Sequence, residues 1–404
     1  MKRGLLILTL LLLIPALAFP AWVKQTSETG RNLRAVWHWP WLTMYLQAVA
    51  VGDSGTILMT TNNGSSWVPR TSPTRQTLNG ASYDPNDFII RPWVSVVGGD
   101  SAGVILLSTD GGNTWGIQAS PPTVMNSVSF GDSLRGWAVG RAGAIWRTTD
   151  GGFSWSFQAN PLAVNWNGVC FANSQMGWVC GGIGTIMRTT NGGATWATQA
   201  SGTSVTLRGV SFMNSNIGVV VGDSGKIFST TDGGLAWTPA SSGVTDDLFG
   251  VFWLGGFLGF AVGANGSIIR SSWDRSTWAP DTSGTTRNLR GVNYFFIPDG
   301  GVFTWAVGDS GTILYLFIPT GGVELSPASH LTPYSSHLTV SPNPFVSFAS
   351  VPGHESERFA LYDISGRKVG VYQGDRIGER LPPGVYFLWE AGGRSPLTRI
   401  VKVR

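Results

Sequence analysis

The feature that most constrains the fold of this 404-residue chain is an internal repeat of about 41 residues. Its clearest copies read WAVGRAGAIWRTTDGGFSW at 137–155, WVCGGIGTIMRTTNGGATW at 178–196, VVVGDSGKIFSTTDGGLAW at 219–237 and FAVGANGSIIRSSWDRSTW at 260–278. A period of this length fits one four-stranded blade of a circular array. The chain is therefore predicted to be built from repeated small sheets.

A second short element shows how many repeats the chain contains. It occurs seven times, as NLRAV (32–36), TLNGA (77–81), VMNSV (124–128), NWNGV (165–169), TLRGV (206–210), DLFGV (247–251) and NLRGV (288–292). The box that ends in Trp follows only six of them. The missing piece lies at the start, because AWVKQTSETGRNLR at 21–34 matches TWAPDTSGTTRNLR at 277–290. We predict a seven-bladed β-propeller over 19–318, in which the N-terminal segment supplies the outermost strand of blade seven, since an open array would leave an exposed edge.

Composition and charge agree with an all-β chain. Charged residues make up only 12% and there are 55 Gly and 19 Trp, which favours many tight turns between strands. Residues 22–322 carry 16 basic and 16 acidic side chains. This neutral balance gives no support for nucleic-acid binding.

Within a blade, segments such as LRGVSF, IGVVVG and KIFSTT are predicted to be the first, second and third strands from the centre. The box is then the hairpin between the third and fourth strands. Its Asp or Asn accepts backbone N–H bonds, its glycines supply positive φ, and its Trp packs between sheets. These structural positions are Asn62, Trp67, Asp110, Trp115, Asp150, Trp155, Asn191, Trp196, Asp232, Trp237 and Trp278. The sixth copy, SSWDRSTW, departs from the pattern and predicts the least regular turn.

Both ends of the chain differ from the repeats. Residues 1–18 have two cations, a short apolar run and Ala-Leu-Ala, which is typical of a cleaved signal peptide and too short for a membrane anchor. Residues 319–337 are rich in Pro, Ser and Gly and predict a linker. Residues 338–404 predict a small C-terminal β-sandwich. No other segment is long and apolar enough for a stable transmembrane span.

These parts of the chain resemble three known families. The boxes resemble the Asp-box, or BNR repeat, of sialidase-type propellers, and the whole pattern over 22–318 is most similar to the photosystem II assembly and stability factor family. SPNPF (341–345), LYDISGRKV (361–369), LPPGVYFLW (381–389) and the terminal IVKVR resemble a type IX secretion sorting domain. That resemblance implies contact with secretion machinery and a location that is secreted or on the surface of a Gram-negative bacterium, after passage through the periplasm. It disfavours a role inside a photosynthetic cell.

The candidate binding residues occupy equivalent positions in several blades. Arg34, Arg208 and Arg290 stand at the start of the innermost strands of blades 1, 5 and 7, with Arg287 three residues before one of them. The photosystem family carries a basic patch on one propeller face, so the resemblance points the same way. Asp53, Asp223 and Asp309 lie between the second and third strands of the same blades. They are predicted either to pair with the arginines or to be plain turn residues.

Catalytic and metal chemistry find little support in the sequence. Glu28 is the single Glu of the repeat region and no sialidase Arg motif is present, so no catalytic residue is assigned; an Asp pair of a glycoside hydrolase, Asp53 with Asp309, stays as an alternative. No spacing of the four His suggests a metal site, and no cofactor motif appears.

Cys170 and Cys180 could form a cross-strand disulfide or remain two buried thiols. Trp37, Trp39 and Trp41, with His38, could stack on sugars or pack between blades.

The sequence thus predicts a secreted, non-catalytic propeller that binds a protein or glycan outside the cell. The alternatives are an Asp-pair glycoside hydrolase and, following the family resemblance, an assembly factor for a membrane complex.

Overall fold

The computed structural model describes residues 21–40, 46–83, 93–253, 258–272, 277–297 and 301–318, together with parts of the C-terminal region: 350, 358–363, 368–373, 375–377, 381–382, 384–390 and 398–402. The first 20 residues and 319–349, where the signal peptide and the linker are predicted, lie outside the described residues. Among the residues described, no helix is long and apolar enough to cross a membrane.

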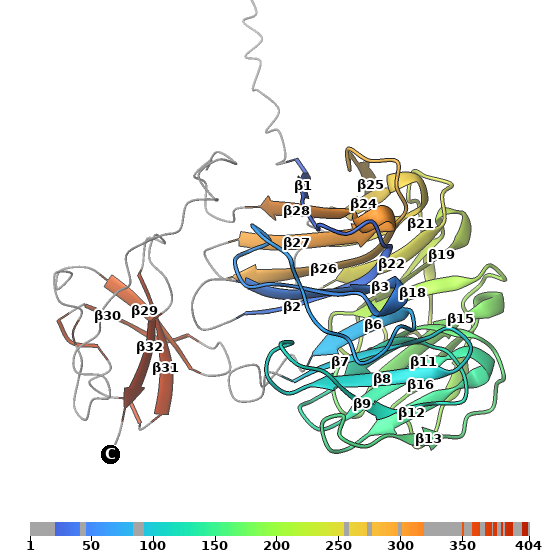
Figure 1. The fold of residues 1–404 in the computed structure, drawn as a ribbon, viewed down its shortest axis with the longest axis horizontal. Coiled ribbons are helices and arrows are strands. Elements are labelled where there is room, and N and C mark those ends of the chain that lie inside the picture. The colour runs from blue at the N-terminus through green and yellow to red at the C-terminus, as the bar shows by residue number, and fades with distance from the viewer. Residues whose placement is uncertain are drawn as a thin grey trace, which may run out of the picture.

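Residues 21–318 form seven four-stranded antiparallel sheets (Figure 1), which confirms the seven-bladed propeller. Blades 1 to 3 contain β2 (Leu33–Pro40), β3 (Leu46–Gly52), β4 (Ile57–Thr60) and β5 (Val68–Pro69); β6 (Leu78–Tyr83), β7 (Val94–Gly99), β8 (Gly103–Ser108) and β9 (Gly116–Ala119); and β10 (Met125–Phe130), β11 (Gly136–Gly140), β12 (Ile145–Thr148) and β13 (Ser156–Gln158). Blades 4 to 6 contain β14 (Trp166–Phe171), β15 (Gly177–Gly181), β16 (Ile186–Thr189) and β17 (Ala197–Gln199); β18 (Leu207–Phe212), β19 (Gly218–Gly222), β20 (Ile227–Thr230) and β21 (Thr238–Ala240); and β22 (Leu248–Trp253), β23 (Gly259–Gly263), β24 (Ile268–Ser271) and β25 (Trp278–Asp281).

Blade 7 closes the ring with the N-terminal strand, as the sequence predicted. It contains β26 (Leu289–Ile297), β27 (Gly301–Gly308), β28 (Ile313–Ile318) and, outermost, β1 (Val23–Gln25). Val23 lies opposite Tyr315 and Gln25 opposite Ile313. The first strands of neighbouring blades contact one another around the full circle, including β26 with β2.

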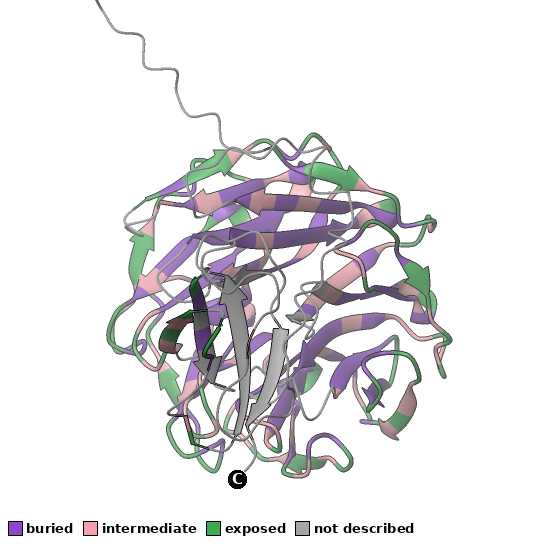
Figure 2. Ribbon diagram, turned by 90° about the vertical axis from the view of Figure 1, so that its left-hand side faces the viewer, coloured by how far each residue is buried: buried purple, intermediate pink, exposed green. Residues whose placement is uncertain are grey.

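The core lies between the faces of adjacent sheets. One cluster joins Leu33, Ala48 and Trp67 of blade 1 to Trp305 and Val307 of blade 7. Figure 2 shows the inner strands as buried and the outermost strands as the exposed circumference. Burying large apolar side chains between blades supplies the main stabilisation, at roughly 25 cal/mol per Å² of apolar surface.

Aromatic side chains order this interface. The ring of Trp137 in blade 3 stacks on Phe171 in blade 4 with a centroid distance of 3.5 Å, and Trp178 stacks on Phe212 of blade 5 in the same way. The box residue Trp196 meets Phe171 edge-on at 6.0 Å. The second-strand tryptophans therefore make the contact between blades, and the box residue Trp196 packs behind it against Phe171 of its own blade.

A short turn joins the second and third strands in six of the blades described. These turns are η1 (Asp53–Gly55), η2 (Arg141–Gly143), η3 (Gly182–Gly184), η4 (Asp223–Gly225), η5 (Ala264–Gly266) and η6 (Asp309–Gly311). The middle residue of each is left-handed, with φ of 52–55°, and the following Gly also has positive φ. At Gly55 a Cβ would stand 2.0 Å from the carbonyl oxygen of Thr74, so this turn also needs Gly for space.

The C-terminal strands form one antiparallel sheet in the order β30 (Lys368–Gln373), β29 (Arg358–Asp363), β31 (Gly384–Glu390) and β32 (Thr398–Lys402). The FALYD and GVYFLWE segments are strands of this sheet. A second sheet, which a sandwich requires, is not found among the residues described in this region.

Candidate functional site

One position in every innermost strand is set apart by a β-bulge. In blade 1, Leu33 lies opposite Gly52 and Ala35 opposite Val51, so that Arg34 has no partner across the strand pair. The same shift occurs in each blade, and a bulge of this kind turns a side chain away from the regular sheet. The seven bulged residues, called the rim residues below, are Arg34, Asn79, Asn126, Asn167, Arg208, Phe249 and Arg290.

The rim has an amide side in blades 2 to 4. The side-chain Nδ2 of Asn79 donates to the backbone oxygen of Met125, 3.0 Å away in the next blade. Asn126 donates to the oxygen of Trp166 and Asn167 to that of Leu207, each at 2.8 Å. Sequence reasoning missed these residues, although their alignment with the Arg positions marks them. Their amides are used to join neighbouring blades.

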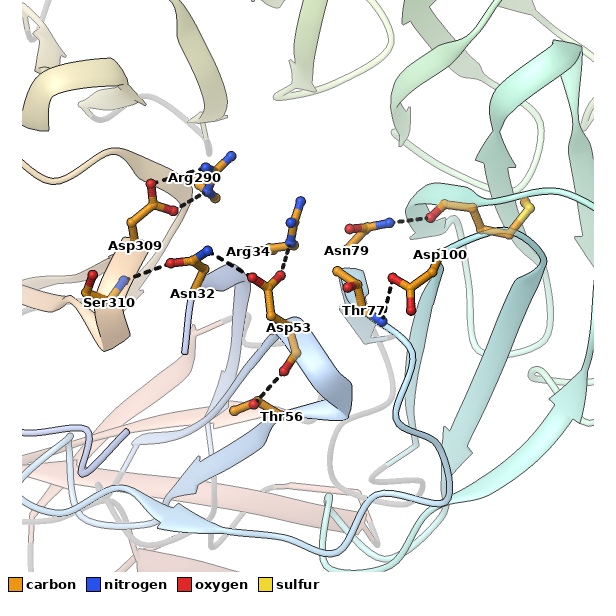
Figure 3. Close-up of polar contacts among 11 residues, drawn as sticks. Asn32, Arg34, Asp53, Thr56, Thr77, Asn79, Asp100, Arg290, Asp309 and Ser310 are labelled. Carbon is orange, nitrogen blue, oxygen red and sulfur yellow. Dashed lines mark hydrogen bonds and ion pairs between the residues drawn. The ribbon is translucent and has the colours of Figure 1, made fainter. Parts of the chain in front are cut away.

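The rim has a cationic side in blades 5 to 1. Nε of Arg34 lies 2.6 Å from Oδ1 of Asp53, and Nε of Arg290 lies 2.5 Å from Oδ1 of Asp309, with Nη2 3.1 Å from Oδ2. Arg208 pairs in the same way with Asp223. Each Asp opens the short turn of its own blade. Figure 3 shows Arg34 and Arg290 extending from adjacent blades on the same side of their carboxylates.

Each Asp orients its arginine without occupying all of the hydrogen-bond donors of the guanidinium. A guanidinium has five N–H donors, and these pairs engage one or two of them. The Arg34 side chain is 34% exposed and that of Asp53 26%, so the pair contributes little to stability by itself. The arrangement presents partly exposed, oriented donors suited to carboxylate or phosphate groups.

Asparagine side chains tie two of these pairs to the preceding blade of the ring. Nδ2 of Asn32 donates to Oδ2 of Asp53 at 2.9 Å, while its Oδ1 accepts the backbone N–H of Ser310 in blade 7 at 3.0 Å. Asn288 donates likewise to Oδ2 of Asp309 at 2.9 Å, and its Oδ1 accepts the backbone N–H of Asn265 in blade 6 at 3.1 Å. The pair of Arg34 and Asp53 is thus held at the non-covalent seam between blades 7 and 1.

The environment of Asp309 keeps it ionised. Partial burial by itself would raise the pKa of this carboxyl, but hydrogen bonds from Arg290 and Asn288 and the charges of Arg290 and Arg34 outweigh it and lower the pKa below its ordinary value of 3.8. A general acid of a glycoside hydrolase needs a raised pKa. Asp309 therefore fits a positioning role better than acid catalysis.

Phe249 occupies the rim position between Arg208 and Arg290, and it was not singled out from the sequence. Cζ of Arg208 lies 5.4 Å from the centroid of its ring, and Cζ of Arg290 lies 5.7 Å from it. Both distances are in the range of cation–π contacts. Arg287, by contrast, is exposed on the loop before β26, where its backbone N–H donates to Oγ1 of Thr285 at 3.1 Å.

The box turns form a separate, structural set of contacts. Oδ1 of Asp110, Asp150 and Asp232 accepts the backbone N–H four residues later at 2.9–3.0 Å, and Asn62 and Asn191 do the same. The indole N–H of Trp115 donates to Gly112 and that of Trp155 to Gly152, while Trp67 donates to Gln25. Nε1 of Trp196 and of Trp237 is buried without a partner among the described residues. Residues 273–276 of the sixth box are outside the described part.

The remaining candidates have packing roles. Cys170 and Cys180 are free thiols, because the register places them opposite Trp178 and Gly168 respectively; the disulfide alternative was wrong. Burial raises the pKa of Cys170 to about 11 and raises that of Cys180 as well.

Trp37 packs edge-on against Phe252, and buried His38 lies against Phe295 and Trp305. Burial lowers the pKa of His38 to about 3, against a raising contact with Asn293. Trp41 and the side chain of Trp39 lie outside the described residues.

Metal ligation has no geometric basis in the described part of the chain. There, no three His, Cys, Asp or Glu side chains gather in a way that could hold an ion.

The fold and its rim define the class of this molecule: a seven-bladed propeller with an Arg-bearing end. A family model described as photosynthesis system II assembly factor YCF48 matches residues 117–200. The structure resembles one titled "YCF48 bound to D1 peptide" at 20% identity and a TM-score of 0.60, covering 75% of this chain and 99% of that one. YCF48 from Cyanidioschyzon merolae is similar at 19% identity and 0.59, covering 73% and 98%.

The fold is also shared outside that family. The WD40 propeller domain of Doa1 has a TM-score of 0.58 at 12% identity, covering 75% of this chain and 98% of that one. No curated protein sequence matches the chain. At these identities the likeness establishes the fold, and function must be argued from the site.

Proposed function

We propose that this chain is a non-catalytic binding propeller whose cationic rim, formed by Arg34, Arg208 and Arg290, holds a protein partner. The observation that carries the proposal is the set of Arg–Asp pairs, in which each carboxylate fixes one edge of a guanidinium and leaves further donors free. Preorganised donors bind a carboxylate without first having to be ordered. The solved YCF48 structure with a D1 peptide shows that a propeller of this fold can take a peptide.

The place of action is part of the proposal. The signal-peptide pattern of residues 1–18 and the sorting-domain pattern of 338–404 support export through a type IX pathway to the outside of a Gram-negative cell. There the partner is a surface or extracellular protein, or a glycan bearing acidic groups. Mass spectrometry of cell-surface and medium fractions tests this part separately. It shows whether the protein reaches these fractions and whether the 319–404 segment is retained or removed there.

A second candidate is an assembly factor for a membrane complex. The match of residues 117–200 to the YCF48 model favours it. Both candidates require protein binding at the propeller, and they differ in where the partner is found.

The test is capture by the immobilised full chain from surface and cytoplasmic membrane fractions, compared with a triple variant Arg34→Gln, Arg208→Gln, Arg290→Gln. Arg135→Gln is the matched control, since its pair with Asp132 (2.6 Å) lies in the loop after β10, away from the rim. The same partner retained by wild type and control but lost from the triple variant supports the proposal. Equal retention by all three overturns it, and release of reducing sugar from polysaccharide would favour the hydrolase alternative.

A further inference from the structure

The cationic rim is not a uniform basic patch. Its three arginines share the arc of blades 5, 6, 7 and 1 with Phe249, and the first strands of these blades are neighbours in the ring. The order along the arc is Arg208, Phe249, Arg290 and Arg34. Every Arg on it has an Asp of its own, so the net charge contributed by these pairs is zero. A ligand is therefore selected by the positions of donors and of the aromatic ring more than by overall charge.

Phe249 is a half-buried apolar surface in the middle of this arc. Residues at the same position in blades 2 to 4 are Asn, each used for a bond to the next blade. Phe249 forms no such bond and instead has the guanidiniums of Arg208 and Arg290, from the two neighbouring blades, at 5.4 and 5.7 Å from its centroid. Stacking of this kind holds a planar cation in one orientation.

The distances of 5.4 and 5.7 Å between the guanidiniums and the ring are about 1 Å shorter than the side-chain repeat of an extended peptide, a difference that flexible side chains can span. Side chains on one face of an extended chain recur every second residue, about 6.6–6.8 Å apart. Three such side chains can meet Arg208, Phe249 and Arg290 in succession. The outer two would be carboxylates and the central one apolar.

We propose that Phe249 is the specificity-determining residue of this face, and that it selects an extended partner segment with the pattern acidic–x–apolar–x–acidic. The apolar side chain covers the ring of Phe249, while Arg208 and Arg290 hold the two carboxylates through the donors that Asp223 and Asp309 leave free. This inference rests on the proposed binding function of the cationic rim.

Acetylated and amidated peptides test it by calorimetric titration of the full chain. The probes are Glu-Thr-Leu-Thr-Glu, Glu-Thr-Ser-Thr-Glu, the reordered Leu-Thr-Glu-Thr-Glu, and Lys-Thr-Leu-Thr-Lys. We expect the first to bind about tenfold more tightly than the second, the ratio corresponding to partial burial of one Leu side chain. The reordered and lysine peptides should bind more weakly than the first.

Variants assign the preference to the ring. Phe249→Asn, which introduces the residue found in blades 2 to 4, should abolish the preference for Leu over Ser. Phe249→Leu should keep part of it while weakening all acidic peptides, because the guanidiniums lose their stacking partner. Asn126→Ala, on the amide side of the rim, is the control and should leave the preference unchanged.

Equal binding of the Leu and Ser peptides, binding of neither, or a preference that survives Phe249→Asn would overturn the inference. The proposed function is judged separately by Arg-dependent capture of the natural partner. If capture needs the arginines but the peptides show no preference for Leu, the binding function stands and the role assigned to Phe249 fails.

Discussion

Asn32 and Ser310, which lie 278 residues apart in the sequence, are joined by a hydrogen bond of 3.0 Å between blades 1 and 7. The other end of the Asn32 amide holds Asp53, the partner of Arg34. Closure of the ring and orientation of a rim arginine therefore depend on one side chain.

The first prediction concerns this side chain. Asn32→Ala should lower the free energy of unfolding by about 1–2 kcal/mol, because Asp53 and the N–H of Ser310 lose a partner. It should also weaken partner capture. The control is Asn165→Ala: Asn165 accepts the N–H of Ala142 at 3.0 Å and belongs to a blade without a rim Arg. Urea unfolding should show similar losses of unfolding free energy for both variants, while partner capture should fall only for Asn32→Ala. Equal capture by both variants would contradict the prediction, because partner binding would then not depend on the Asn32 contact.

The second prediction concerns Gln25 in the closing strand. Its Oε1 accepts the indole N–H groups of Trp67 at 3.0 Å and Trp305 at 3.1 Å. Gln25→Ala leaves both without this acceptor and should cost about 2–4 kcal/mol. The matched control is Gln199→Ala, because Gln199 donates to Gly233 while its Oε1 is buried without a partner among the residues that the structure describes. A loss at position 25 no larger than at 199 would contradict the role of Gln25 as the closing contact.

The third prediction concerns backbone strain in blade 4. Ile183 has φ of 55° and is 75% exposed, and a β-branched residue is unfavourable in the left-handed region. Ile183→Asn, the residue at the equivalent Asn265 of blade 6, should stabilise the fold by about 1 kcal/mol. The reciprocal Asn265→Ile should destabilise it, and by more, since Asn265 also donates to Asp246 at 2.9 Å. Thermal unfolding of the two variants checks the opposite signs, and equal signs would count against strain.

The fourth prediction follows from the lowered pKa of Asp309. A carboxyl whose pKa is lower in the folded state stabilises the fold above its ordinary pKa of 3.8, and this contribution is lost as the pH falls through the folded-state value. Asp309→Asn should therefore be less stable than wild type at pH 7, and the difference should shrink below about pH 4. A difference that grows on acidification would contradict the assigned ionisation.

Sequence periodicity was sufficient for the blades but not for the contacts between them. The innermost strand predicted as LRGVSF is β18, Leu207–Phe212, and the match of 21–34 to 277–290 located the closing strand. Both follow from local repetition. The recurrence of Arg at one position likewise led to Arg34, Arg208 and Arg290.

The bulge could not be predicted, because it arises from pairing between strands. It sets the Arg positions out of register, and in blade 4 it shifts the pairing so that Cys180 lies opposite Gly168. The contacts of Phe249 with two arginines were hidden for the same reason, since they join side chains from three blades. A repeat alignment shows which residue breaks a pattern but not which neighbours it meets.

The most direct test of the central claim is the dissociation constant of the captured partner, once purified, for wild type, Arg135→Gln and the triple variant Arg34→Gln, Arg208→Gln, Arg290→Gln. The account predicts equal affinity for the first two and a loss of at least about a hundredfold for the third, as removal of three charge-assisted contacts implies, while the third variant still unfolds in a cooperative transition above the temperature of the measurement. An unchanged dissociation constant in a folded triple variant would contradict binding at this rim.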